Sequence, residues 1–87
     1  MTREQRAGQV RLMLRWPSRR NELKRVSQGP ALDLFEVYEL ASVAFVHWSN
    51  EPHSTAAAIA EDYRLMLSEI EQDVAKHLAQ GAMSNAR

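Results

Sequence analysis

The chain has 87 residues, room for one small domain, and its 11 basic and 11 acidic residues balance to a net charge of zero. It contains no cysteine, so a disulfide framework and a thiolate metal site are excluded. The longest apolar stretch, residues 40–46, is far shorter than the roughly 20 residues that a membrane-spanning helix needs. Arginines interrupt the N-terminal segment where a secretory signal would be apolar, so we expect a cytoplasmic protein without a membrane partner.

The charges are unevenly distributed along the chain. Residues 1–30 carry eight basic and two acidic side chains, a net charge of +6. Residues 31–87 carry three basic and nine acidic side chains, a net charge of −6. A chain polarised in this way can fold its basic part onto its acidic part, pair with a copy of itself, or bind an anionic partner.

The N-terminal third has the least decisive pattern. Residues 1–8 are polar and are expected to form a flexible arm. Residues 9–16 alternate between apolar and polar side chains up to Pro17, which predicts a short strand. The same residues also form a helical face, so strand, helix and disorder all stay open for this segment. Residues 18–28 are expected to form a short basic helix.

Two longer helices are predicted in the rest of the chain. Pro30 fits the first turn of a helix, and the apolar residues that follow predict a helix over about 30–48. After a polar turn, apolar residues at steps of three and four predict a second helix over about 54–80. The short connection makes these helices antiparallel neighbours, an αα-hairpin. The single helical domain then covers 9–81, and 82–87 forms a disordered tail.

Apolar side chains cover nearly the whole circumference of the helix at 30–48, which indicates a central helix covered on more than one side. The second helix offers only one apolar stripe, so the N-terminal third, a second subunit or both must cover the remainder. We expect both, and therefore an all-α fold: a small helical bundle that forms a homodimer. The residues expected to form the dimer or partner face are Phe35, Tyr38, Phe45 and Trp48.

A strand followed by two helices is the element order of ribbon–helix–helix repressors, whose paired strands enter the major groove of DNA. The sequence Leu-Arg-Trp-Pro at residues 14–17 resembles the end of the strand in Arc-type members of that family. The resemblance implies a dimeric DNA-binding regulator in which Arg11, Met13 and Arg15 point at base edges. Residues 18–28 depart from the family, because they are mostly polar where the first helix of that fold is amphipathic.

Basic side chains are concentrated within residues 9–25. They could bind DNA phosphates through charge alone. They could also form ion pairs with the acidic stripe of Asp33, Glu36 and Glu39, or with an acidic face of a partner subunit. We prefer such ion pairing over DNA binding. The residues assigned to nucleic-acid binding under the alternative are Arg11, Arg15, Arg19, Arg20, Lys24 and Arg25.

The sequence has no motif that indicates catalysis or a cofactor. Glu69, Asp73 and His77 share one side of the predicted second helix. The first and third of them are about 12 Å apart along the helix axis, however, too far to hold one metal ion. No glycine-rich phosphate loop and no nucleophile motif is present. We therefore expect a non-enzymatic, regulatory protein that acts through protein–protein interaction and has no metal or cofactor, with the DNA-binding regulator as the alternative.

Overall fold

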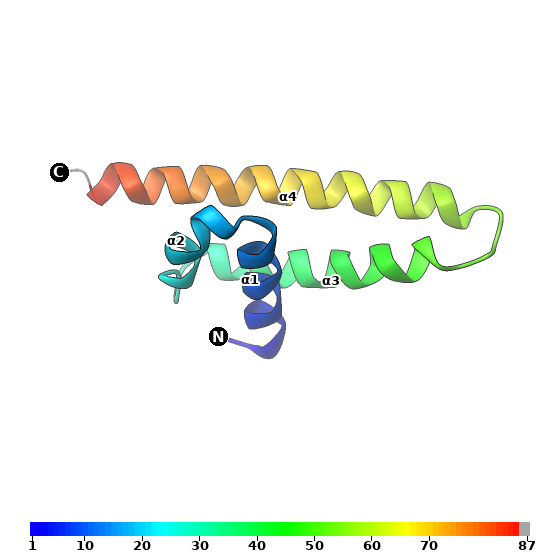
Figure 1. Cartoon of the computed structure of the whole chain (residues 1–87), viewed down its shortest axis with the longest axis horizontal. Helices are drawn as coiled ribbons and strands as arrows, with labels where there is room; N and C mark the ends of the chain where they lie inside the picture. Colours follow the sequence, from blue (N-terminus) through cyan, green and yellow to red (C-terminus); the bar gives the residue numbers. More distant parts are fainter. Residues whose placement is uncertain (86–87) are drawn as a thin grey trace.

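The computed structural model describes residues 1–85, and the regular structure within them is helical throughout (Figure 1). The elements are α1 (Arg3–Arg15), the 3₁₀ turn η1 (Pro17–Arg19), α2 (Arg20–Lys24), α3 (Ala31–Ser49) and α4 (Ala56–Asn85). Helices α3 and α4 lie side by side and run in opposite directions, and α1 crosses α3 (Figure 1). The molecule is elongated, with extents of 53 × 22 × 21 Å. The predicted all-α fold class is confirmed for these residues.

Of the three conformations left open for residues 9–16, the strand is wrong and the helix is found, because residues 9–15 belong to α1. The flexible arm predicted over 1–8 is also wrong, because α1 begins at Arg3. A capping box starts this helix. The Thr2 hydroxyl accepts a hydrogen bond from the Gln5 backbone N–H at 3.1 Å, and the Gln5 side-chain oxygen accepts from the Thr2 N–H at 2.8 Å. These bonds satisfy amide groups that the first turn would otherwise leave without partners.

Burial along α1 follows the helical period. Leu12 is fully buried, whereas Leu14 is 77% exposed. A strand would have placed both leucines on the same side, since its side chains alternate with a period of two. Gly8, Gln9 and Leu12 form the buried face instead. A helix also satisfies its own backbone groups, which a lone strand cannot do without a second strand.

The segment after α1 is shorter and less regular than the predicted helix over 18–28. Pro17 ends α1 and begins η1, and α2 has only five residues. Leu23 of α2 is fully buried. The buried side chain of Gln9 in α1 holds this segment in place: its Nε2 donates to the carbonyl oxygens of Leu23 at 2.8 Å and Val26 at 3.2 Å.

The start of α3 depends on a glycine. Gly29 has a φ of 92°, a left-handed conformation that glycine adopts without steric cost. Pro30 follows as the N-cap of α3 and donates no amide hydrogen, as expected for proline at a helix start. At the other end of α3, the Asn50 side chain donates to the carbonyl oxygen of Val46 at 2.9 Å. The same oxygen accepts from the Asn50 backbone N–H at 3.2 Å, so the side chain adds a second bond to this carbonyl at the helix end.

Helix α4 is longer than predicted and passes through Gly81. Its backbone is helical to Asn85, so the disordered tail predicted over 82–87 is wrong for most of its length; residues 86–87 lie outside the described residues. A glycine inside a helix costs about 1 kcal/mol relative to alanine, which is too little to end a helix of this length.

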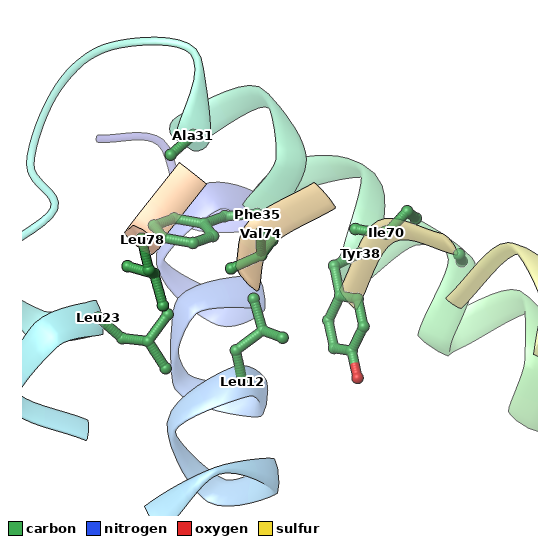
Figure 2. Packing of buried hydrophobic residues seen from close by; sticks show 9 residues of the cluster. Leu12, Leu23, Ala31, Phe35, Tyr38, Ile70, Val74 and Leu78 are labelled. Carbon is green, nitrogen blue, oxygen red and sulfur yellow. The ribbon is translucent and has the colours of Figure 1, made fainter. Parts of the chain in front are cut away.

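The core lies where α1 and α2 meet the α3–α4 pair. Leu12 of α1, Leu23 of α2, Phe35 of α3 and Val74 of α4 are the largest fully buried side chains (Figure 2). All four helices therefore contribute to one core. This core occupies only part of the long α3–α4 pair, because α1 and α2 both lie toward the end that is remote from the connecting turn (Figure 1).

Candidate protein interface

Helix α3 exposes apolar side chains outside the core. Val37, Leu40, Val43 and Val46 are 43%, 57%, 53% and 52% exposed. We call these four residues the α3 surface. Residues three positions apart are neighbours on a helix, but each such step also turns by about 60° around the axis, so Val37 and Val46 lie on opposite sides of α3. Leu40 and Val43 are the adjacent pair at the centre, and adjacent exposed apolar residues mark an interaction site more strongly than scattered ones do.

A groove adjoins the α3 surface. The N-terminal half of α1 extends past α3 on the side away from α4 (Figure 1). Between this part of α1 and α3 lies an open groove of about 690 Å³. Leu40, Val43 and His47 line it from α3, and Arg3 and Ala7 line it from α1. An open groove with an apolar floor and a charged rim is the kind of site that takes a helix of another chain.

The position of α1 over α3 depends on Gly8. A Cβ atom at this position would overlap the backbone carbonyl group of Phe35. Only glycine therefore allows the two helices to approach as closely as they do. The close crossing fixes the direction in which α1 leaves α3, and with it the position of Arg3 beside the groove.

An ion pair supports the same crossing. The Nε atom of Arg11 in α1 lies 3.0 and 2.9 Å from the two carboxylate oxygens of Glu39 in α3. This hydrogen bond lowers the pKa of the Glu39 carboxyl group below its ordinary value and raises the pKa of the Arg11 guanidinium. The Glu39 side chain is 13% exposed and that of Arg11 is 41% exposed, so solvent weakens the attraction.

Replacing Glu39 with glutamine is expected to lower the free energy of unfolding at neutral pH by about 0.5 kcal/mol. Because the folded-state pKa of Glu39 is depressed, its contribution is complete above the ordinary value of 4.5 and is lost as the pH falls through the folded-state pKa. Urea unfolding at a series of pH values below 7 measures this, and the difference between wild type and E39Q should shrink as the pH falls below 4.5. A difference that stays constant over the acidic range would contradict the ion-pair assignment.

A second polar contact joins three helices. The Tyr38 hydroxyl of α3 donates to Oε2 of Glu71 in α4 at 2.7 Å, and Nε of Arg15 in α1 lies 3.7 Å from the same oxygen. Burial, followed by the hydrogen bond to Glu71, raises the pKa of Tyr38. Tyr38 therefore stays protonated and remains a donor at all physiological pH values.

The basic residues assigned to nucleic-acid binding divide into two groups. Three of them form ion pairs within the chain: Arg11 with Glu39, Arg15 with Glu71, and Arg19 with Glu22. Arg19 also lies over the Trp16 ring, 5.7 Å from its centroid. The other three are exposed and form no ion pair among the residues that the structure describes; they are Arg20, Lys24 and Arg25. Within the predicted acidic stripe, Glu39 forms an ion pair, and its partner is Arg11.

The predicted partner face is partly wrong. Phe35 and Tyr38 are 1% and 6% exposed, so they belong to the core of the chain itself. Phe45 and Trp48 are half-buried. The apolar residues that are most exposed on α3, such as Leu40 and Val43, were not among those predicted. The sequence did indicate that α3 would have exposed apolar residues. A helix that is apolar nearly all round must leave some apolar side chains uncovered when only two neighbouring helices pack on it.

The described residues contain neither a metal-binding cluster nor a membrane-spanning helix. Among residues 1–85 no group of three or more histidine, aspartate or glutamate side chains is arranged to hold a metal ion. Within the same residues, none of the helices combines the length and the apolar character needed to cross a membrane.

No protein-family model matches the chain, and no curated protein or solved structure matches it at a significant level.

Proposed function

We propose that this protein is non-enzymatic and regulatory, and that it acts through protein–protein interaction in which a second copy of the chain covers Leu40 and Val43 of the α3 surface. The observation that carries this proposal is the exposure of two adjacent aliphatic side chains on one face of α3, Leu40 at 57% and Val43 at 53%. Burying an exposed leucine or valine contributes about 1.5–3 kcal/mol at most. In a twofold symmetric dimer each residue contributes twice.

The charge distribution supports a second copy as the partner. Five basic side chains of the N-terminal third form no ion pair among the described residues; they are Arg3, Arg6, Arg20, Lys24 and Arg25. Residues 31–87, in contrast, carry a net charge of −6. A second copy therefore presents both the apolar surface and the opposite charges that the first copy leaves without partners.

Sedimentation velocity over a range of protein concentrations tests the proposal. Wild type is expected to dimerise, and L40E is expected to weaken the dimer at least tenfold, because each interface would bury two carboxylates in an apolar contact. Leu65 of α4 is a matched control, since it is 48% exposed and lies outside the α3 surface. The L65E variant should dimerise like wild type. A wild type that stays monomeric at all concentrations, or an L65E variant as impaired as L40E, would contradict the proposal.

Nucleic-acid binding stays the alternative function. The exposed basic side chains Arg20, Lys24 and Arg25 favour it. The helical conformation of residues 9–15 and the ion pairs of Arg11 and Arg15 count against the ribbon–helix–helix arrangement. A monomeric wild type that binds duplex DNA with a steep salt dependence would favour this alternative.

A further inference from the structure

We infer that two copies pair through antiparallel α3 helices, with Leu40 of one copy packed against Val43 of the other. This inference rests on the proposed homodimer and specifies its geometry. Glu36, Leu40, Val43 and His47 are spaced four, three and four residues apart. That spacing places them in one stripe along the helix, as at the contact line of two paired helices. Leu40, Val43 and His47 are exposed, and Glu36 is half-buried.

The order of residues in this stripe favours antiparallel over parallel pairing. Its two central residues, Leu40 and Val43, are apolar, and its two ends, Glu36 and His47, are polar. A parallel pair would place Glu36 against Glu36 of the partner copy, and like charges at such short range are unfavourable. An antiparallel pair places Glu36 against His47 of the partner copy, where the carboxylate can accept a hydrogen bond from the imidazole. The stripe is therefore complementary to itself only in the antiparallel direction.

The N-terminal half of α1 adds charge complementarity to the same arrangement. Helix α3 contains three acidic residues and no lysine or arginine, whereas the N-terminal half of α1 contains Arg3, Arg6 and one acidic residue, Glu4. The groove between α1 and α3 lies along the stripe, and Arg3 stands on its rim. An α3 helix from a second copy in this position would bring acidic side chains close to the basic side chain of Arg3. It would also fill the groove and cover the exposed side chains of Leu40 and Val43.

Site-directed cross-linking tests this register, and the absence of cysteine from the chain makes single-cysteine variants specific. E36C and H47C would be purified separately, mixed, and treated with a short bismaleimide cross-linker. Antiparallel pairing predicts a cross-linked dimer in the mixture and little product from E36C alone. In E36C alone the two thiols would be about 16 Å apart along the helix axis, at 1.5 Å per residue. S68C, at an exposed position of α4, is the control that should not cross-link with either variant.

The outcomes separate this inference from the proposed function. Cross-linking of the mixture at least tenfold above that of E36C alone supports the antiparallel register. Efficient cross-linking of E36C with itself, in a protein that sediments as a dimer, overturns the register and leaves the proposed homodimer standing. A monomer in sedimentation velocity, with circular dichroism showing that the variants retain the helical content of wild type, overturns both.

Discussion

Replacing Gly8 with alanine is expected to lower the free energy of unfolding by about 3 kcal/mol, the upper end of the usual cost of overpacking. The added methyl group would overlap the backbone carbonyl of Phe35. A backbone atom inside a helix cannot rotate away as a side chain can, so α1 would have to move off α3. Urea unfolding followed by circular dichroism measures the loss. The fluorescence of Trp16, which packs against the core, reports whether α1 remains docked, provided that the second tryptophan, Trp48, is replaced with phenylalanine in both proteins.

Gly81 provides a matched control for this substitution. It also lies inside a helix, but a Cβ atom there would meet nothing within 4 Å. G81A is therefore expected to stabilise the protein by about 0.5–1 kcal/mol, because alanine loses less conformational freedom than glycine on entering a helix. Opposite signs for the two variants would establish that the cost of G8A comes from the helix crossing. Equal effects would show that α1 and α3 do not approach closely at Gly8.

Truncation of Leu12 to alanine should have the second large effect, a loss of about 2–5 kcal/mol in the free energy of unfolding. Leu12 is fully buried between α1 and the α3–α4 pair, in contact with the cluster that includes Phe35 and Val74 (Figure 2). The removed methyl groups would leave a cavity that the surrounding helices can only partly fill. Chemical denaturation at 25 °C measures the change.

Leu14 makes this experiment a test of conformation as well as of packing. It is 77% exposed, so L14A is expected to change the free energy of unfolding by less than about 0.5 kcal/mol. A strand would turn Leu12 and Leu14 to the same face, and the two truncations would then have similar effects. A large difference between L12A and L14A therefore supports the helix, and similar losses would contradict it.

The long helices could be predicted from sequence because each carries its own local signals. Proline at the start of α3 and apolar steps of three and four in α4 depend only on neighbouring residues. The conformation of residues 9–16 was harder to predict, because their apolar positions fit the period of two of a strand as well as one face of a helix. The threonine and glutamine of the capping box, at positions 2 and 5, were the local signal that would have favoured a helix.

The candidate interface was less predictable than the helices. An apolar circumference indicates that a helix has several neighbours, but it does not say which side each neighbour covers. That choice depends on Gly8, because the crossing at this residue places α1 over Phe35 and leaves Leu40 and Val43 uncovered. Contacts between α1 and α3 join residues about 28 positions apart, such as Arg11 and Glu39, and no local pattern encodes them.

The buried amide of Gln9 bears on the order in which the protein folds. Helix α2 has five residues, too few to be stable as an isolated helix. The carbonyl groups of Leu23 and Val26 receive hydrogen bonds from the Gln9 side chain, which reaches them only from a formed α1. We therefore expect residues 17–26 to acquire structure together with α1 or after it. The N-terminal third is then expected to open and close as one cooperative unit.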